Sequence, residues 1–123
     1  MMEAELTKEI IGGAIEVHKH WGPGLYEDIY ERSLYHELRL RNLEFESQVR
    51  LPLIYKGERV GDDLRLDLIV MGKVVVELKA VKALEPIHEA QLLTYMKLTG
   101  CKVGLLINFN VPVLKQGIKR MVL

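Results

Sequence analysis

The chain has 123 residues, of which 49% are hydrophobic, enough apolar material for one buried core and little more. Seventeen Lys and Arg residues balance seventeen Asp and Glu residues, so the formal net charge is zero. This balance argues against a protein that coats nucleic acid non-specifically, because such proteins carry a basic surplus that displaces counterions from phosphates. A single cysteine, Cys101, excludes an intramolecular disulfide and a zinc site made of several cysteines of one chain.

The apolar runs of the sequence are short, and its N-terminus is charged. None of the runs approaches the roughly 20 residues that a membrane-spanning helix requires. The first residues lack the basic and then apolar pattern of a signal peptide. We therefore expect one domain over residues 1–123 that is cytoplasmic and does not enter a membrane.

Two helices open the predicted fold. Apolar residues recur every three or four positions from Glu3 to Trp21, and again from Leu25 to Arg41, which is the period of a helix with one buried stripe. A Gly-Pro-Gly corner at residues 22–24 separates the two segments, since proline lacks a backbone donor and glycine tolerates a tight turn.

Strands follow the helices. Alternating and β-favouring residues predict strands at Phe45 to Leu53, Leu64 to Val70, Lys73 to Leu78 and Val103 to Asn108. Turns at Gly57, Gly61 and Gly72 favour an antiparallel meander. A helix opened by proline, from Pro86 to Thr99, and a short strand from Ile118 to Leu123 complete the predicted order.

One predicted hairpin carries the chemistry. If its turn consists of the three residues 71–73, Asp67 stands directly opposite Glu77, with Cβ atoms about 5 Å apart. Strand alternation then puts Lys79 on the same face. A two-residue turn would oppose Asp67 to Val76 and separate the carboxylates onto opposite faces. The site hypothesis depends on this register.

Two adjacent carboxylates repel each other unless a cation lies between them, and hard oxygen ligands suit Mg²⁺ or Mn²⁺. Lys79 beside them could hold a water molecule and stabilise charge on a phosphate oxygen. These are the parts of metal-assisted phosphodiester hydrolysis. Judged on spacing alone, the alternative is a solvated cross-strand charge cluster in which Lys79 pairs with a carboxylate.

Several motifs carry a resemblance that extends over nearly the whole chain. The segment from Gly24 to Tyr30 matches the pattern G-x-x-E-x-x-Y. Further matching stretches are Tyr55 to Gly57, Asp67 to Val70, Val75 to Val81, Glu89 to Tyr95 and Gly104 to Phe109. On these residues the chain resembles the GxxExxY protein family, which is grouped with the PD-(D/E)xK nuclease superfamily.

The resemblance implies an α/β fold of the α+β type, a single nuclease-like domain with a central mixed sheet and a β-meander flanked by helices. It also implies Asp67 and Glu77 as metal ligands, together with the main-chain carbonyl of Leu78. Lys79 would be the catalytic lysine, and Gln91 the helix residue that often follows the motif. One departure is Leu66, which stands where the motif's name has proline. That proline contributes no ligand.

The helix that contains the family's signature adds two candidates. Glu27 and Tyr30 lie three residues apart and so project from one face of a helix. The functional interpretation makes Glu27 a third carboxylate of the catalytic cluster, oriented by Tyr30, which also binds substrate. The structural alternative makes Glu27 a first-turn acid favoured by the helix dipole and Tyr30 a core aromatic.

The later helix and the loop before it supply the remaining candidates. Gln91 and Tyr95 lie four residues apart on one face, where Gln91 binds substrate or holds the catalytic water and Tyr95 binds substrate. The alternative for Gln91 is a polar residue at the boundary of helix and sheet. Lys82 joins Lys79 in a basic rim and is assigned to substrate binding.

The leading functional hypothesis is a Mg²⁺-dependent nuclease that hydrolyses DNA or RNA by means of a metal-activated water. The main alternative is a non-catalytic module with a nuclease-like fold that binds nucleic acid or a protein partner. Hydrolysis of a small phosphorylated molecule is a third hypothesis, which would suit a narrow pocket and the weak overall basicity. The sequence reveals no interface, so a homodimer stays open as an assembly.

Overall fold

The computed structural model describes residues 1–123 and has three α-helices packed on a five-stranded sheet. The helices are α1 (Glu3–Trp21), α2 (Glu27–Leu40) and α3 (Pro86–Thr99). The strands of the main sheet are β1 (Phe45–Leu51), β4 (Leu64–Val70), β5 (Val74–Lys79), β6 (Val103–Asn108) and β7 (Ile118–Val122). A 3₁₀ turn, η1 (Leu114–Gly117), leads into β7.

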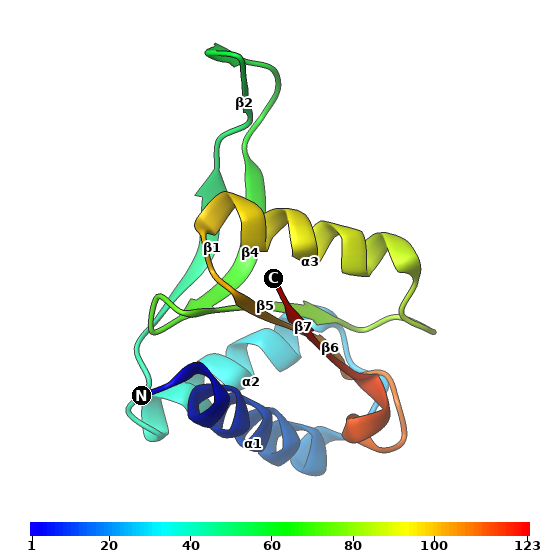
Figure 1. Ribbon diagram of the computed structural model, residues 1–123. Coiled ribbons are helices and arrows are strands. Elements are labelled where there is room, and N and C mark those ends of the chain that lie inside the picture. The colour runs from blue at the N-terminus through cyan, green and yellow to red at the C-terminus, as the bar shows by residue number, and fades with distance from the viewer.

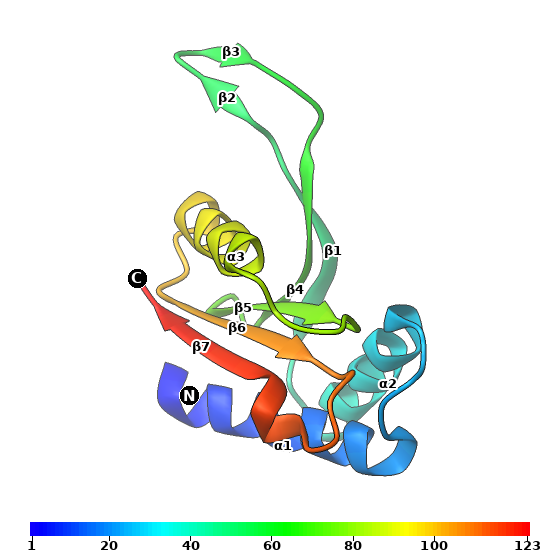
Figure 2. The same cartoon turned by 90° about the vertical axis from the view of Figure 1, so that its right-hand side faces the viewer.

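The sheet is mixed, in the order β1-β4-β5-β6-β7. β5 and β6 are parallel and are joined by α3, whereas the other neighbouring strands pair antiparallel. Helices α1 and α2 lie against one face of the sheet and α3 lies against the other, as Figures 1 and 2 show. The predicted fold class, a mixed sheet with a β-meander flanked by helices, is confirmed.

Each face of the sheet has its own buried cluster because strand residues alternate between the two faces. Val74, Val76 and Leu78 of β5 face α1 and α2. Val75 between them faces α3. Gly104 in β6 lets α3 approach closely, since a Cβ there would lie 2.7 Å from the sulfur of Met96.

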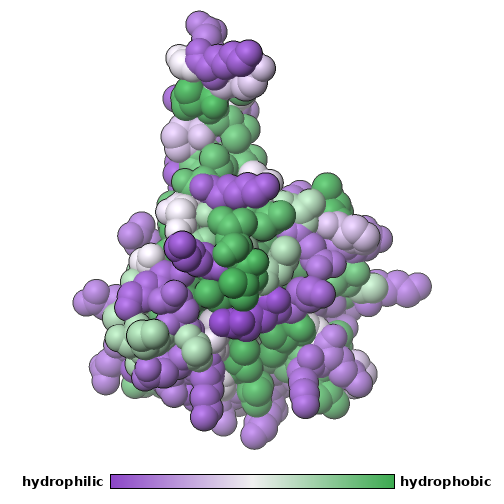
Figure 3. Space-filling model, viewed as in Figure 1, coloured by the Kyte–Doolittle hydropathy of each residue, from purple (hydrophilic) through white to green (hydrophobic).

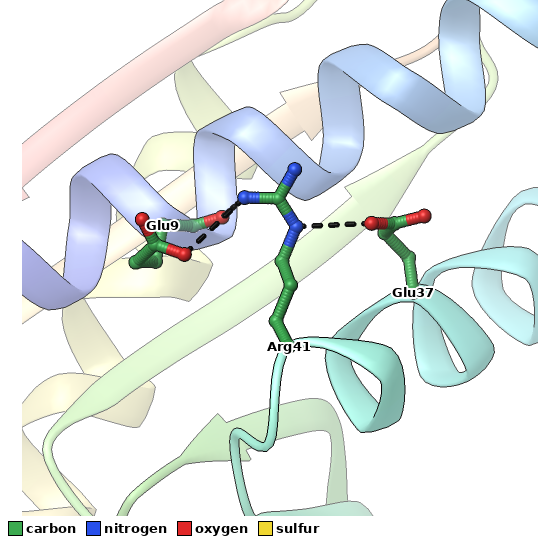
Figure 4. Close-up of polar contacts among 3 residues, drawn as sticks. All are labelled: Glu9, Glu37 and Arg41. Atoms are coloured by element: carbon green, nitrogen blue, oxygen red, sulfur yellow. Dashed lines mark hydrogen bonds and ion pairs between the residues drawn. The ribbon is translucent and has the colours of Figure 1, made fainter.

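Arg41, just after α2, fixes the two N-terminal helices against each other (Figure 4). Its Nη1 lies 3.3 Å from Oε1 of Glu9 on α1, and its Nε donates to Oε2 of Glu37 at 2.9 Å. The guanidinium lies over Gly12, where a Cβ would be only 3.0 Å from Nη1. This anchor sets the position of α2, which carries Glu27.

Between β1 and β4 the chain forms an arm that projects beyond the sheet (Figures 1 and 2). The arm ends in a hairpin of two short strands, β2 (Ile54–Tyr55) and β3 (Glu58–Arg59). Lys56 and Gly57 both have positive φ, at 48° and 86°, as the tight turn of such a hairpin requires. Hydrophobic surface runs along the arm below its hydrophilic tip (Figure 3). Because the arm begins after β1, the first strand of the sheet stops at Leu51 and not at the predicted Leu53.

No helix of the structure combines the length and the apolar character needed to span a membrane.

Candidate functional site

The register of β4 and β5 brings the two central carboxylates together. Val70 pairs with Val74 and Leu68 pairs with Val76, which is the register of a three-residue turn. The turn is formed by Met71 and Gly72, both with positive φ, and Lys73. The predicted register is confirmed, and the alternative that would oppose Asp67 to Val76 is excluded.

The backbone pairing of β4 and β5 ends at Leu68 and Val76. Beyond this pair the strands separate, and carboxylates accept the hydrogen bonds of the backbone N–H groups. The backbone N–H of Asp67 donates to Oε1 of Glu77 at 2.7 Å. In return, the N–H of Leu78 donates to Oδ2 of Asp67 at 2.8 Å. Each carboxylate thus accepts from the opposite strand in the place of a main-chain carbonyl. Asp67 and Glu77 are neighbours on one face, as the site hypothesis requires.

Burial disfavours the negatively charged form of these two carboxyl groups. Only 6% of Glu77 is exposed. Burial raises the pKa of Glu77 to about 8, and the negative charge of Asp67 contributes in the same direction. The pKa of Asp67 is raised as well, first by burial and then by the charge of Glu31. A proton or a cation relieves this repulsion. The pair is therefore not the solvated surface cluster of the structural alternative.

Lys79 lies two residues beyond Glu77 on β5 and is half-buried. Its positive charge opposes the rise in the pKa of Glu77 and of Asp67. None of the ion pairs of the molecule involves Lys79, so its ammonium group is not held in a salt bridge with either acid. The ammonium group is close enough to act on the charge of the cluster and is free to contact a ligand.

Glu27 reaches the cluster from the first turn of α2. Its side chain is exposed, yet its pKa is raised by partial burial and by the negative charge of Asp67. The charge of Lys79 acts on Glu27 in the opposite direction. Glu27 therefore lies near enough to the carboxylate pair for their charges to interact, and its role in catalysis stays a prediction.

Tyr30 does not belong to the site surface, and its assignment to substrate binding is wrong. The residue is fully buried, and its ring stacks on Phe109 with centroids 4.6 Å apart. Its hydroxyl donates to the carbonyl of Gly22 at 2.6 Å and accepts from the N–H of Leu25 at 3.1 Å. Tyr30 thus holds the corner between α1 and α2, and thereby the start of the helix that carries Glu27.

On α3, Tyr95 lies near enough to the cluster for the carboxylate charges to act on its hydroxyl. It is half-buried, and its pKa is raised by burial and by the negative charges of Glu77 and Asp67. Gln91 lies one helical turn earlier and is exposed. Gln91 and Tyr95 stay predicted contacts with substrate or water.

The loop after β5 is held in place by Asn108, a residue that the sequence interpretation did not single out. Asn108 is 1% exposed at the end of β6. Its side chain accepts from the N–H of Val81 at 3.0 Å and donates to the carbonyl of Val81 at 2.9 Å. Lys82, which follows Val81 in the chain, is exposed. It borders an open hollow of about 400 Å³ that His88 also lines. Its predicted contact with substrate stays open.

A second hydrogen-bond network lies beside Asp67 and was also missed. Oε2 of Glu31, one turn after Glu27, accepts hydrogen bonds from the hydroxyl of Tyr35 and from Nε2 of Gln48, both at 2.5 Å. Gln48 lies in β1 opposite Asp67, between the pairs Ser47–Leu68 and Val49–Leu66, and has an unusual φ of 50°. The four-residue spacing of Glu27 and Glu31 could have indicated Glu31. Nothing local in the sequence marks Gln48.

The donor atoms fit a hard divalent cation with few protein ligands. No group of three or more His, Cys, Asp or Glu side chains is arranged to hold a metal ion. The candidate ligands are the carboxylates of Asp67 and Glu77 and the main-chain carbonyl of Leu78, whose side chain is buried in the core. Mg²⁺ usually keeps several waters and binds through one or two carboxylates. The chemistry of the donors therefore suits Mg²⁺ or Mn²⁺.

The chain matches the family model of the PD-(D/E)XK nuclease superfamily over residues 4–121 and therefore belongs to this superfamily, whose nucleases typically use divalent metals. Its fold is similar to the crystal structure of SSO0001, with a TM-score of 0.56 and 23% sequence identity. The match covers 77% of this chain and 48% of SSO0001, so the chain spans about half the length of that protein. No protein of the curated set has a sequence that matches.

Proposed function

We propose that the protein is a Mg²⁺- or Mn²⁺-dependent nuclease that hydrolyses phosphodiester bonds in DNA or RNA. The observation that carries this proposal is the pair of buried Glu77 and half-buried Asp67, with Lys79 beside it outside any salt bridge. Two raised carboxyl pKa values in one cluster are typical of functional sites. The resemblance to the GxxExxY family supports the same site residues.

Each residue has a separate task in the proposed reaction. Asp67, Glu77 and the carbonyl of Leu78 would hold the cation, which lowers the pKa of a water molecule and neutralises charge on the phosphate. The ammonium group of Lys79 orients the attacking water and stabilises a non-bridging phosphate oxygen. Glu27 and Tyr95 border the cluster from two helices, where they limit the directions from which a substrate can approach.

The main test measures cleavage of labelled single- and double-stranded DNA and RNA, with Mg²⁺ or Mn²⁺ and with a chelator. Glu77→Gln is the sharpest variant, because its amide oxygen can still accept from the N–H of Asp67 while the charge is lost. We expect this variant to lose both metal affinity and cleavage. Lys79→Met should keep metal affinity and slow cleavage by roughly a hundredfold, the scale of one lost transition-state contact.

Glu46→Gln serves as the matched control, because Glu46 is an exposed carboxylate on β1, in the same sheet. It should cleave at the wild-type rate. Equal cleavage by wild type and Glu77→Gln would reveal a contaminating nuclease. If no substrate is cleaved with either metal, the nuclease proposal fails, and a non-catalytic binding module becomes the better description of this zero-net-charge protein.

A further inference from the structure

Two arginines stand directly opposite each other on the ribbon formed by β1 and β4. Arg50 pairs with Arg65, and both residues are exposed. Neither arginine forms a salt bridge in the molecule. Like charges that are directly opposed across two strands destabilise a sheet. The pair therefore costs folding stability, and an anion held between the two guanidinium groups would remove that cost.

The arginine pair lies beside the candidate active site, because Arg65 is two residues before Asp67 on β4. The flanking pair Val49–Leu66 turns to the other side of the ribbon, into the buried cluster under α3. Arg50 and Arg65 therefore turn away from α3, to the side of the ribbon on which Gln48 contacts Glu31 of α2. Two strand residues span roughly 6.5–7 Å, so the arginines lie one step from Asp67 in the direction of the arm.

We propose that Arg50 and Arg65 together bind a backbone phosphate of a nucleic-acid strand, next to the phosphate that reaches Asp67 and Glu77. This inference rests on the proposed function. Guanidinium groups bind phosphate oxygens through paired hydrogen bonds, and two opposed arginines offer donors from both sides. We call Arg50 and Arg65 the phosphate clamp. One strand of nucleic acid would pass over the clamp and then over the catalytic cluster beside it.

A local clamp also explains how a chain with no net charge can bind a polyanion. A protein that binds nucleic acid non-specifically spreads basic residues over its surface. This chain has no net charge, but it places two arginines together at one cross-strand pair. A strand of nucleic acid presents successive phosphates, so it can occupy the clamp and the carboxylate site at the same time. A partner protein with isolated carboxylates offers no such repeat, and for this reason nucleic acid is the better occupant.

The test measures the affinity of fluorescent single-stranded oligonucleotides for Glu77→Gln protein, in which cleavage does not interfere. Arg50→Gln and Arg65→Gln should each weaken binding roughly tenfold, the scale of one charged hydrogen-bonded contact. The slope of log affinity against log salt should fall in magnitude by about 0.7 when one phosphate contact on a single strand is lost. Arg120→Gln is the control, because Arg120 is an exposed strand arginine on β7, at the opposite edge of the sheet.

A stability measurement separates binding from a structural role. Without nucleic acid, the double variant should unfold at the same temperature as the parent or at a higher one, because repulsion is relieved. A lower unfolding temperature, or a loss of affinity no greater than that of Arg120→Gln, would overturn the clamp. So would arginine-dependent binding of polyglutamate without binding of oligonucleotides, which would indicate a protein partner. Arginine-dependent binding without metal-dependent cleavage would support the clamp while the nuclease proposal fails.

Discussion

At the scale of single residues, Asp67 and Glu77 combine two tasks that usually fall to different groups. They accept main-chain hydrogen bonds where β4 and β5 separate, and they bring two carboxyl groups together, of which Glu77 is buried and Asp67 half-buried. The first task ties them to the fold, whereas the second makes the metal-free fold sensitive to pH.

The metal-free protein should lose stability as the pH rises. The folded-state pKa of Glu77 is raised from 4.5 to about 8, so the native state keeps a proton that the unfolded chain releases. Protons are bound more tightly by the folded state in this range, and the free energy of unfolding therefore falls from about pH 4.5 to about pH 8. Denaturant titrations with a chelator at pH 5 and pH 8.5 would measure the fall.

Glu77→Gln provides the control for this titration, because it removes the main titrating group. Its stability should depend less on pH than that of the wild type. Some dependence should remain, since the pKa values of Asp67 and Glu27 are raised in the same direction. A wild-type protein that is equally stable or more stable at pH 8.5 would contradict the prediction.

Metal binding should reverse the pH effect. A ligand that binds only the folded state stabilises it by about 2.7 kcal/mol at one hundred times its dissociation constant. We expect Mn²⁺ to raise the unfolding temperature of wild type, and to raise it more at pH 8 than at pH 5, because protons compete for the same oxygens. Calorimetry of wild type and Glu77→Gln would measure this, and an equal response of both proteins would place the metal elsewhere.

Single residues also show which parts of the site local sequence patterns predict and which they do not. The carboxylate pair was predictable, because turn length and strand alternation fix which side chains oppose each other. The burial of Tyr30 was not, because its partner Phe109 lies far along the chain and no local pattern encodes that contact. Gln48 was hidden for the same reason, since its importance arises only from pairing with β4.

At the scale of elements, β1 is distorted opposite the site. Gln48 has a φ of 50°, a conformation that non-glycine residues rarely adopt. Gln48→Ala and Gln48→Gly both remove the hydrogen bond to Glu31, but only glycine adopts this φ without strain. The glycine variant should therefore be more stable than the alanine variant by about 1 kcal/mol, the reverse of an ordinary strand position. Chemical denaturation of the two variants would decide.

The contact between α1 and α2 depends on Arg41. Arg41→Ala removes the hydrogen bonds to Glu9 and Glu37 and should lower the free energy of unfolding by about 1–2 kcal/mol, since the guanidinium is only partly exposed. Arg32→Ala, an exposed change on α2, should stay within about 0.5 kcal/mol of wild type. Similar losses in both variants would mean that Arg41 is not an anchor.

The helices and main strands were predictable as elements, because their apolar residues follow the periods of helix and strand. Helix α1 runs from Glu3 to Trp21 and α3 from Pro86 to Thr99, both as expected. The hairpin of β2 and β3 was not recognised, because strands of two residues are too short to show alternation.

At the scale of the whole molecule, the arm stands apart from the body. Ile54, Tyr55 and Val60 are each exposed by 57–61%, so little packing holds the arm in place. Limited trypsin digestion should cut first after Lys56, at the hairpin tip, because exposed tips open with little loss of structure. Arg59 is the slower site, since it pairs with Asp63. Mass spectrometry would identify the first cut, and a first cut after Lys82 would mean that the loop after β5 opens more easily.

The reciprocal hydrogen bonds between β4 and β5 restrict how this site can change in evolution. A descendant that no longer needs catalysis must still provide acceptors for the N–H groups of Asp67 and Leu78, because buried unpaired donors cost about 1–3 kcal/mol. Asparagine and glutamine supply such acceptors without charge, whereas alanine does not. Relatives that have lost the reaction should therefore carry Asn at position 67 or Gln at position 77 rather than small apolar residues, and they should fold well at high pH without metal.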